Sequence, residues 1–177
     1  MRANELFEAP TGFQIYCDMD GVLVDFEGGV QKIMNNPNYN IDDKNQRKDF
    51  WKLMKTMPQE EAVELWATLD WAPGGQELWK YISRFHAAIL SSPGYSLRPL
   101  IEAGKMKWIK KNLRPQPSSV ILTPDKYKHA NKFSILIDDM PKNIIPWEEK
   151  GGVGILYKTG NYKPAIKELQ DRFGFPK

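Results

Sequence analysis

The sequence predicts an α/β fold in which a doubly wound parallel sheet carries a small helical cap inserted after its first strand. Short apolar segments bounded by turn residues recur along the chain, and helical patterns separate most of them. This alternation is typical of a parallel sheet that is covered by helices on both faces. The gap after the first segment is much longer than one crossover connection needs, which predicts the cap.

Five segments are predicted to be the strands of a Rossmann-like sheet. None shows a clear alternation of apolar and polar residues, as expected when both faces of a strand are buried. The segments cover residues 13–17, 86–90, 119–122, 134–137 and 152–156.

The segments between these strands are predicted to be helices, because apolar residues recur in them at helical spacing. They cover residues 76–85, 100–113, 141–150 and 163–173. The third begins at Pro141, whose fixed φ suits the first turn of a helix, and ends before two glycines. The long gap holds several helical patterns and three of the six tryptophans. We therefore predict a cap at residues 26–71 and a core domain at residues 1–25 and 72–177.

The composition fits an ordinary globular protein. The chain has 177 residues and a formal net charge of +3, which permits an anionic substrate but gives no reason to expect a nucleic-acid polymer. Cys17 is the only cysteine, so no intrachain disulfide can form, which fits a reducing, cytoplasmic setting. No apolar run is long enough for a membrane span, and the first residues lack the apolar core of a signal peptide.

Polar side chains follow four of the predicted strands at their carboxyl ends, where open parallel sheets bind ligands. Asp18 and Asp20 repel each other unless a cation or a shared proton lies between them. With Asp138 they would form an oxygen-rich site of the kind that suits Mg²⁺. The full set is Asp18, Asp20, Ser91, Ser92, Thr123, Asp125, Lys126, Asp138 and Asp139.

These residue types can together transfer a phosphoryl group. An aspartate can attack phosphorus in line, while a lysine and two hydroxyls hold the phosphoryl oxygens. A second carboxyl group can protonate the leaving oxygen and later activate water. Simpler interpretations exist for single groups: Asp139 could cap the next helix, and Lys126 and Lys128 would by default be solvated. They require several coincidences at one edge, so we favour a catalytic site.

Four segments together resemble the motifs of haloacid dehalogenase-type (HAD) phosphohydrolases. They are DMDGVLVDF, the apolar run that ends in Ser91, a downstream lysine and ILIDDMP. DMDGVLVDFE, LSSP, LTPDK, LIDDMPKNI and GGVGIL resemble, in the same order, segments of the 5′(3′)-deoxyribonucleotidases and their phage and bacterial relatives. This resemblance implies a Mg²⁺-dependent nucleotidase that removes phosphate from deoxyribonucleoside monophosphates through an aspartyl-phosphate.

The resemblance also implies roles for the acidic residues. Asp18 would be the nucleophile. Asp20 would be the general acid and base and would offer its backbone carbonyl to the metal. Asp138 would bind the metal, and Asp139 would reach it through water or orient the lysine.

Further roles follow from the same resemblance. Ser91 would bind the phosphoryl group with Ser92 beside it, and Lys126 matches the family lysine, with Lys128 in reserve. The nucleoside would lie in the cap. The aromatic candidates for contact with it are Phe26, Phe50 and Trp51, followed by Trp66.

Alternative functions stay open at this point. A phosphatase of the same mechanism could act on nucleic-acid 3′-ends or another small metabolite, although no basic stripe suited to a duplex is evident. A receiver-type phosphoacceptor also uses strand-end aspartates, but its acidic pair comes early and it needs no cap. The lysine-rich helix at residues 100–113 is interpreted as a solvated face, with Lys105 a candidate for the phosphate pocket. Pairing into a homodimer is a further expectation from the small cap.

Overall fold

The computed structural model describes residues 12–177 of the chain. Residues 1–11, which include most of the segment compared with a signal peptide and the start of the predicted core domain, lie outside the described residues. Within residues 12–177 no helix is long and apolar enough to cross a membrane.

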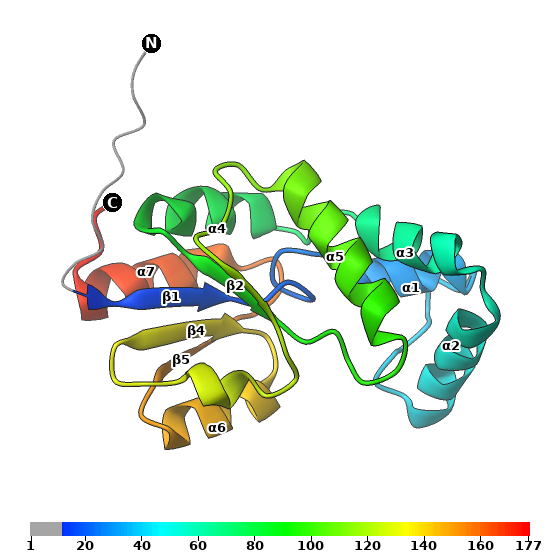
Figure 1. Cartoon of the computed structure of the whole chain (residues 1–177). Coiled ribbons are helices and arrows are strands. Elements are labelled where there is room, and N and C mark those ends of the chain that lie inside the picture. The colour runs from blue at the N-terminus through cyan, green and yellow to red at the C-terminus, as the bar shows by residue number, and fades with distance from the viewer. Residues whose placement is uncertain (1–11) are drawn as a thin grey trace, which may run out of the picture.

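A sheet of five parallel strands forms the centre of the molecule (Figure 1), so the predicted fold class is confirmed. The order across the sheet is β3-β2-β1-β4-β5, and every neighbouring pair is parallel. The strands are β1 (Gln14–Cys17), β2 (Ala88–Ser91), β3 (Val120–Leu122), β4 (Ser134–Asp138) and β5 (Val153–Leu156). The second strand begins two residues later than predicted, because His86 adopts a left-handed turn with φ of 55°.

Helices cover both faces of the sheet. Side chains alternate along each strand, so Ile15 and Cys17 point to one face and Tyr16 to the other. The first face packs against α4 (Gly75–Ile82), α5 (Arg98–Asn112) and α7 (Tyr162–Phe173). The second face packs against α6 (Pro141–Glu149) through a smaller cluster that includes Trp147. Short 3-10 segments at Ser83–Phe85 (η2) and Lys126–His129 (η3) complete the core.

The strand order reverses at β1, because the chain first builds the sheet toward β3 and then restarts at β4 on the other side. Cys17 of β1 lies opposite Ile137 of β4. Asp18 and Asp138 therefore follow side by side at the carboxyl edge. This point in an open α/β sheet is where a crevice for ligands forms.

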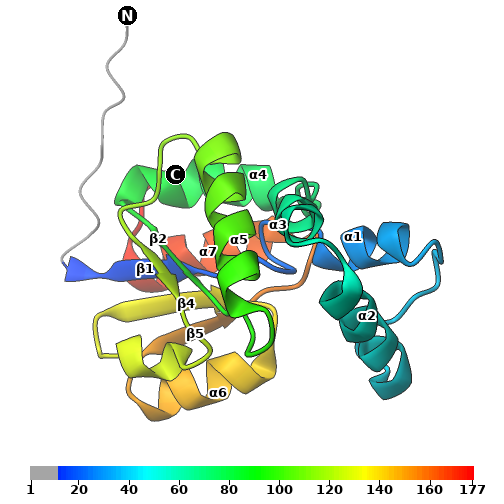
Figure 2. The same ribbon diagram turned by 45° about the vertical axis from the view of Figure 1, so that its right-hand side comes forward.

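Three helices between β1 and α4 lie outside the sheet, at one end of the molecule (Figures 1 and 2). They are α1 (Phe26–Ile33), α2 (Lys44–Thr56) and α3 (Gln59–Ala67). We call residues 26–71 the cap; its standing as a separate domain stays a prediction. The two connections between cap and core are bonded to each other, through Asp25 N to Asp70 O at 2.9 Å and Ala72 N to Leu23 O at 2.9 Å.

Helix α5 joins the core to the cap by packing closely against α3. Gly104 makes this approach possible, since a Cβ there would lie 2.4 Å from the Trp66 Cβ and 2.6 Å from the Val63 carbonyl oxygen. Trp108 of α5, which is buried, donates its indole N–H to the Leu69 carbonyl at 2.8 Å.

We predict that Gly104→Ala destabilises the protein, although alanine is the better helix former. The added methyl group overlaps backbone as well as side chain, which costs about 1–3 kcal/mol and exceeds the gain in helix propensity. Chemical denaturation would measure this change in the free energy of unfolding. Lys110→Ala, on the exposed part of the same helix, is the control and should change it by less than about 0.5 kcal/mol. Equal stability of Gly104→Ala and the native chain would contradict the close packing of α3 on α5.

Candidate active site

Two aspartates and a lysine form the floor of the site. Asp18 follows β1 and Asp138 ends β4, and both are buried. The Lys126 ammonium, 2% exposed, lies 2.8 Å from Asp18 Oδ2 and 2.6 Å from Asp138 Oδ2. One buried cation thus bridges the ends of two neighbouring strands.

This bridge keeps the nucleophile candidate ionised. Burial acts to raise the pKa of Asp18, but the charges of Lys126 and Lys105 outweigh it and lower the pKa. Burial would likewise lower the pKa of Lys126, yet Asp18 and Asp138 raise it. Both partners therefore stay charged around neutral pH.

A second buried lysine holds the other aspartate. Lys105 of α5, 1% exposed, donates to Asp20 Oδ2 at 2.6 Å, to Ser91 Oγ at 2.9 Å and to the Ser92 carbonyl at 3.1 Å. Asp20 Oδ1 is buried and has no hydrogen-bond partner among residues 12–177. Burial and the charge of Asp18 raise the pKa of Asp20 despite the nearby lysine, which favours a carboxyl group that can hold a proton.

Three carboxylates are placed to hold a metal ion. One oxygen each from Asp18, Asp138 and Asp139 lies within 4.8 Å of the others. Burial, together with the charges of Asp18 and Asp138, raises the pKa of Asp139 to about 7. Asp139 Oδ1 is buried without a partner among the described residues. An oxygen-only donor set with uncompensated negative charge fits a hard divalent cation such as Mg²⁺.

The backbone around the cluster is shaped to bring these oxygens together. Gly21 has φ of 75°, and a Cβ there would lie 2.2 Å from Asp139 Oδ2. Asp138 is oriented by Asn143, whose amide donates to both of its carboxylate oxygens at 2.9 and 3.0 Å, and by the Met140 N–H at 2.9 Å. Asp138 thus accepts the hydrogen bond at the start of α6, and no side-chain cap involves Asp139.

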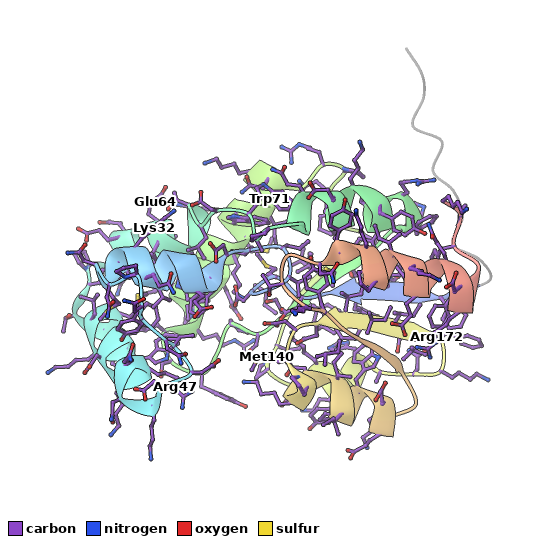
Figure 3. All side chains as sticks on the ribbon, turned by 180° about the vertical axis from the view of Figure 1, so that it is seen from behind. Lys32, Arg47, Glu64, Trp71, Met140 and Arg172 are labelled. Atoms are coloured by element: carbon purple, nitrogen blue, oxygen red, sulfur yellow. The ribbon has the colours of Figure 1, made fainter. Side chains whose placement is uncertain are left out.

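A cleft of about 710 Å³ opens over this cluster between core and cap. Figure 3 labels Arg47 on the cap and Met140 on the core, and both line the cleft. The predicted substrate residues that line it are Phe26, Trp51 and Ser92. Ser91 is fully buried and does not line the cleft, but its hydroxyl accepts a hydrogen bond from Lys105.

Two predicted substrate residues lie elsewhere. Phe50 is fully buried beneath Trp51 and Phe26, at ring-centroid distances of 5.1 and 6.0 Å, and does not line the cleft. The sequence could not separate it from its neighbour, because adjacent helical positions point in different directions. Lys128 is exposed and pairs with Asp125 at 2.7 Å, so Lys126 is the lysine that reaches the cluster.

Trp66, a weaker candidate, packs within the cap. Its ring stacks on Phe26 at 4.9 Å with an interplanar angle of 11°. The sequence predicts Lys105 only as a candidate for the phosphate pocket, because the other lysines of α5 are solvated and only the helical phase turns this one inward. Its spacing with buried Ile101, Trp108 and Ile109 is the signal that could have found it.

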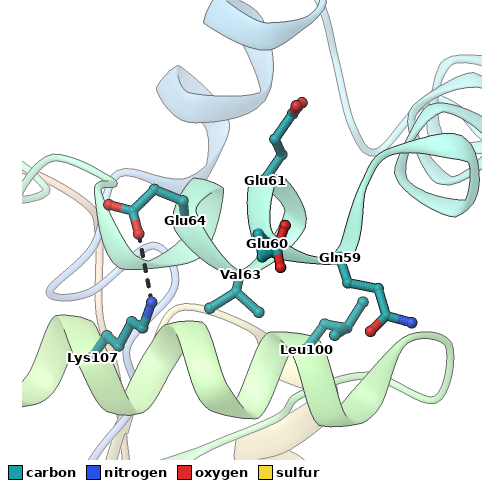
Figure 4. Close-up of a pocket in the computed structure, with 7 residues that line it drawn as sticks. All are labelled: Gln59, Glu60, Glu61, Val63, Glu64, Leu100 and Lys107. Atoms are coloured by element: carbon teal, nitrogen blue, oxygen red, sulfur yellow. Dashed lines mark ion pairs between the residues drawn. The ribbon is translucent and has the colours of Figure 1, made fainter.

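A second hollow, of about 530 Å³, lies between α3 and α5 away from the carboxylate cluster (Figure 4). Its polar lining consists of surface side chains, with Lys107 and Glu64 paired at 3.7 Å. An exposed ion pair of this kind contributes little energy and offers no catalytic group.

Comparison with known proteins identifies the fold. No family model and no curated protein matches the chain. A HAD-family enzyme of Bacteroides thetaiotaomicron, solved as a magnesium complex, superposes with a TM-score of 0.53 at 16% identity, over 89% of this chain and 99% of that one. A HAD-like hydrolase of Porphyromonas gingivalis gives 0.52 at 13% identity, over 90% and 98%.

The L-2-haloacid dehalogenase of Xanthobacter autotrophicus gives a TM-score of 0.51 at 11% identity, over 93% of this chain and 84% of that one. At such identities the similarity establishes the fold. The chain therefore has the architecture of these HAD proteins, with its carboxylate cluster at the carboxyl edge of the sheet.

We predict that Mg²⁺ raises the unfolding temperature by several degrees, because a cation that binds only the folded chain stabilises it. Asp139→Asn should abolish most of this shift. Without metal, the raised pKa of Asp139 means that stability is lost as pH rises from the ordinary aspartate value of 3.8 to about 7, and the loss is complete above about 7. At pH 8 the metal-free Asp139→Asn variant should therefore be at least as stable as the native chain. Thermal unfolding with and without Mg²⁺ measures both effects, and an undiminished Mg²⁺ shift in Asp139→Asn would count against the site.

Proposed function

We propose that this chain, which has the fold of HAD hydrolases, is a Mg²⁺-dependent phosphomonoester hydrolase that works through an aspartyl-phosphate. The observation that carries the proposal is the ionised, buried Asp18 between two lysines at the floor of an open cleft. The Bacteroides thetaiotaomicron enzyme of similar fold was also solved with magnesium and inorganic phosphate. Bound to Asp18, Asp138 and Asp139, the metal would neutralise charge on the phosphoryl oxygens.

In the first half-reaction a carboxylate oxygen of Asp18 attacks phosphorus, and the bond from phosphorus to the ester oxygen breaks. Asp20 gives its proton to the leaving oxygen, so an alcohol departs and an acyl phosphate remains on Asp18. Lys126 and Lys105 supply fixed positive charge on either side of the reacting group, where it is worth more than in water.

In the second half-reaction Asp20, now ionised, takes a proton from water as the water oxygen attacks phosphorus. The bond from phosphorus to Asp18 breaks, inorganic phosphate leaves, and both aspartates return to their starting states. One water is consumed for each ester. Asp20 Oδ1 supports this role, since no residue within 12–177 forms a hydrogen bond with it that would compete with proton transfer.

We further propose that the substrates are deoxyribonucleoside 5′- or 3′-monophosphates. Phe26 and Trp51 line the cleft, and aromatic faces stack on bases with little dependence on base identity. Asp18, Asp20, Ser91 and Lys126 would carry the chemistry, with Ser92 beside the phosphoryl group. Homodimer formation and a cytoplasmic location belong to this proposal as expectations.

We predict that Asp18→Asn lowers the turnover number at least about a thousandfold, because a neutral amide cannot form the acyl phosphate. The fold should survive, since Lys126 keeps Asp138 as its partner. Phosphate release and circular dichroism would be measured together. Asp171→Asn removes the same charge from the exposed face of α7 and serves as the control. Activity of Asp18→Asn near that of the control would refute the mechanism.

The substrate class is tested with a panel of deoxy- and ribonucleoside 5′- and 3′-monophosphates and a small phosphate ester without a ring. Trp51→Ala should raise KM for nucleotides about tenfold, because a stacked base is lost, and leave KM for the ring-free ester unchanged. An equal rise for both would show that Trp51 does not contact a base. Turnover confined to ring-free esters would support the proposed mechanism but refute nucleotides as the substrates.

A further inference from the structure

One face of helix α2 in the cap carries only positive charge around a tryptophan. Helical spacing brings these residues to one side, where they line a groove of about 500 Å³. The loop before α5 closes the groove through Ser96. The residues on the helix are Lys44, Arg47, Lys48, Trp51, Lys52 and Lys55.

These charges have no acidic partners among the described residues, which distinguishes them from the paired cations of α7. Within residues 12–177 none of the five cations forms an ion pair, and no acidic residue lines the groove. In α7, by contrast, Lys167 and Arg172 each pair with an acidic residue at the i,i+4 position. A track of uncompensated cations is the usual electrostatic footprint of a polyanion site.

The groove runs into the active-site cleft. Arg47 and Trp51 line both cavities. Tyr95, which is 85% exposed, lines the cleft from the loop that also carries Ser96. Tyr127, 37% exposed, lines it from η3. Arg47, Trp51 and Tyr95 therefore form a path from the groove to the carboxylate cluster, along a cleft that Asp25, Glu27 and Asp42 also line.

We propose that this path binds a single-stranded oligonucleotide whose terminal phosphate enters the active site. The lysines of α2 would contact backbone phosphates while Trp51 and Tyr95 stack on unpaired bases, the combination by which proteins bind single strands. The 13-residue helix is about 20 Å long, enough for a few nucleotides. This proposal rests on the proposed hydrolase, because it adds a longer substrate to the mononucleotides proposed for the same site.

The formal net charge of the whole chain is only +3, so it does not reveal the basic groove on α2. The acidic side chains of α3, which include Glu60, Glu61 and Glu64, offset the lysines of α2 in the total but lie in a different hollow. A single strand also needs no broad basic stripe of the kind that a duplex would.

The test compares two double variants that remove equal charge. Lys48→Gln/Lys52→Gln changes the groove, and Lys110→Gln/Lys111→Gln changes an exposed part of α5 outside both groove and cleft. Hydrolysis with Mg²⁺ is followed for a short oligodeoxynucleotide with one terminal phosphate, at either end, and for a ring-free phosphate ester. Binding of the fluorescein-labelled oligonucleotide is measured by anisotropy, independently of turnover.

We expect the groove variant to raise KM and Kd for the oligonucleotide about tenfold and leave the ring-free ester unaffected, while the control changes neither. The slope of log Kd against log salt should fall by about 1.4, because each phosphate contact on a single strand contributes about 0.7. Tyr95→Ala should weaken oligonucleotide binding about fivefold or more through lost stacking.

Equal effects of the two double variants on anisotropy would overturn the inference, even if the ester is hydrolysed normally. Inorganic polyphosphate that competes as well as an unlabelled oligonucleotide would overturn the assignment to nucleic acid. Absence of phosphate release from every ester would instead refute the proposed hydrolase, and the anisotropy comparison would still report on the groove.

Discussion

The structure around the cleft depends on one electrostatic constraint: four carboxylates meet at the carboxyl edge of a parallel sheet. Like charges this close cannot all be ionised in a buried place without compensation. Lys126 of η3 contacts two of these carboxylates, Asp18 and Asp138, and Lys105 of α5 contacts a third, Asp20. When all four aspartates are ionised, the two lysines balance two of the four negative charges. One divalent cation would balance the other two.

The lysines also connect catalysis to folding. Helix α5 carries Lys105, which binds the proton donor Asp20, and it also packs on α3 of the cap at Gly104. The position of the cap and the partner of Asp20 therefore depend on the same helix. Removing Lys126 would leave Asp18 and Asp138 without their shared cation, and breaking a buried ion pair in this way typically costs about 3–5 kcal/mol. Removing Lys105 would take the shared hydrogen-bond donor from Asp20 and Ser91. The two lysines whose charges keep Asp18 ionised therefore also contribute to the stability of the fold.

Charge is distributed unevenly over the cap, and this distribution bears on the substrate. The basic face of α2 borders the cleft, whereas the acidic residues of α3 line the separate hollow beside α5. Long-range attraction would thus draw anions toward the mouth of the site and along α2. A mononucleotide would use only the inner part of this path, and a single strand would use all of it.

The sequence by itself determined the five parallel strands, the inserted helices and most of the acidic cluster, because burial on both faces and strand-end position are local properties of the chain. Asp18, Asp138 and Lys126 could be predicted for that reason. Only the tertiary structure decided which residues point inward. The helical phase of α5 buries Lys105, adjacent positions on α2 separate buried Phe50 from cleft-lining Trp51, and the pairing of Lys128 with Asp125 leaves Lys126 as the bridging cation. Such choices depend on how helices dock on one another, and residues distant in sequence fix that docking.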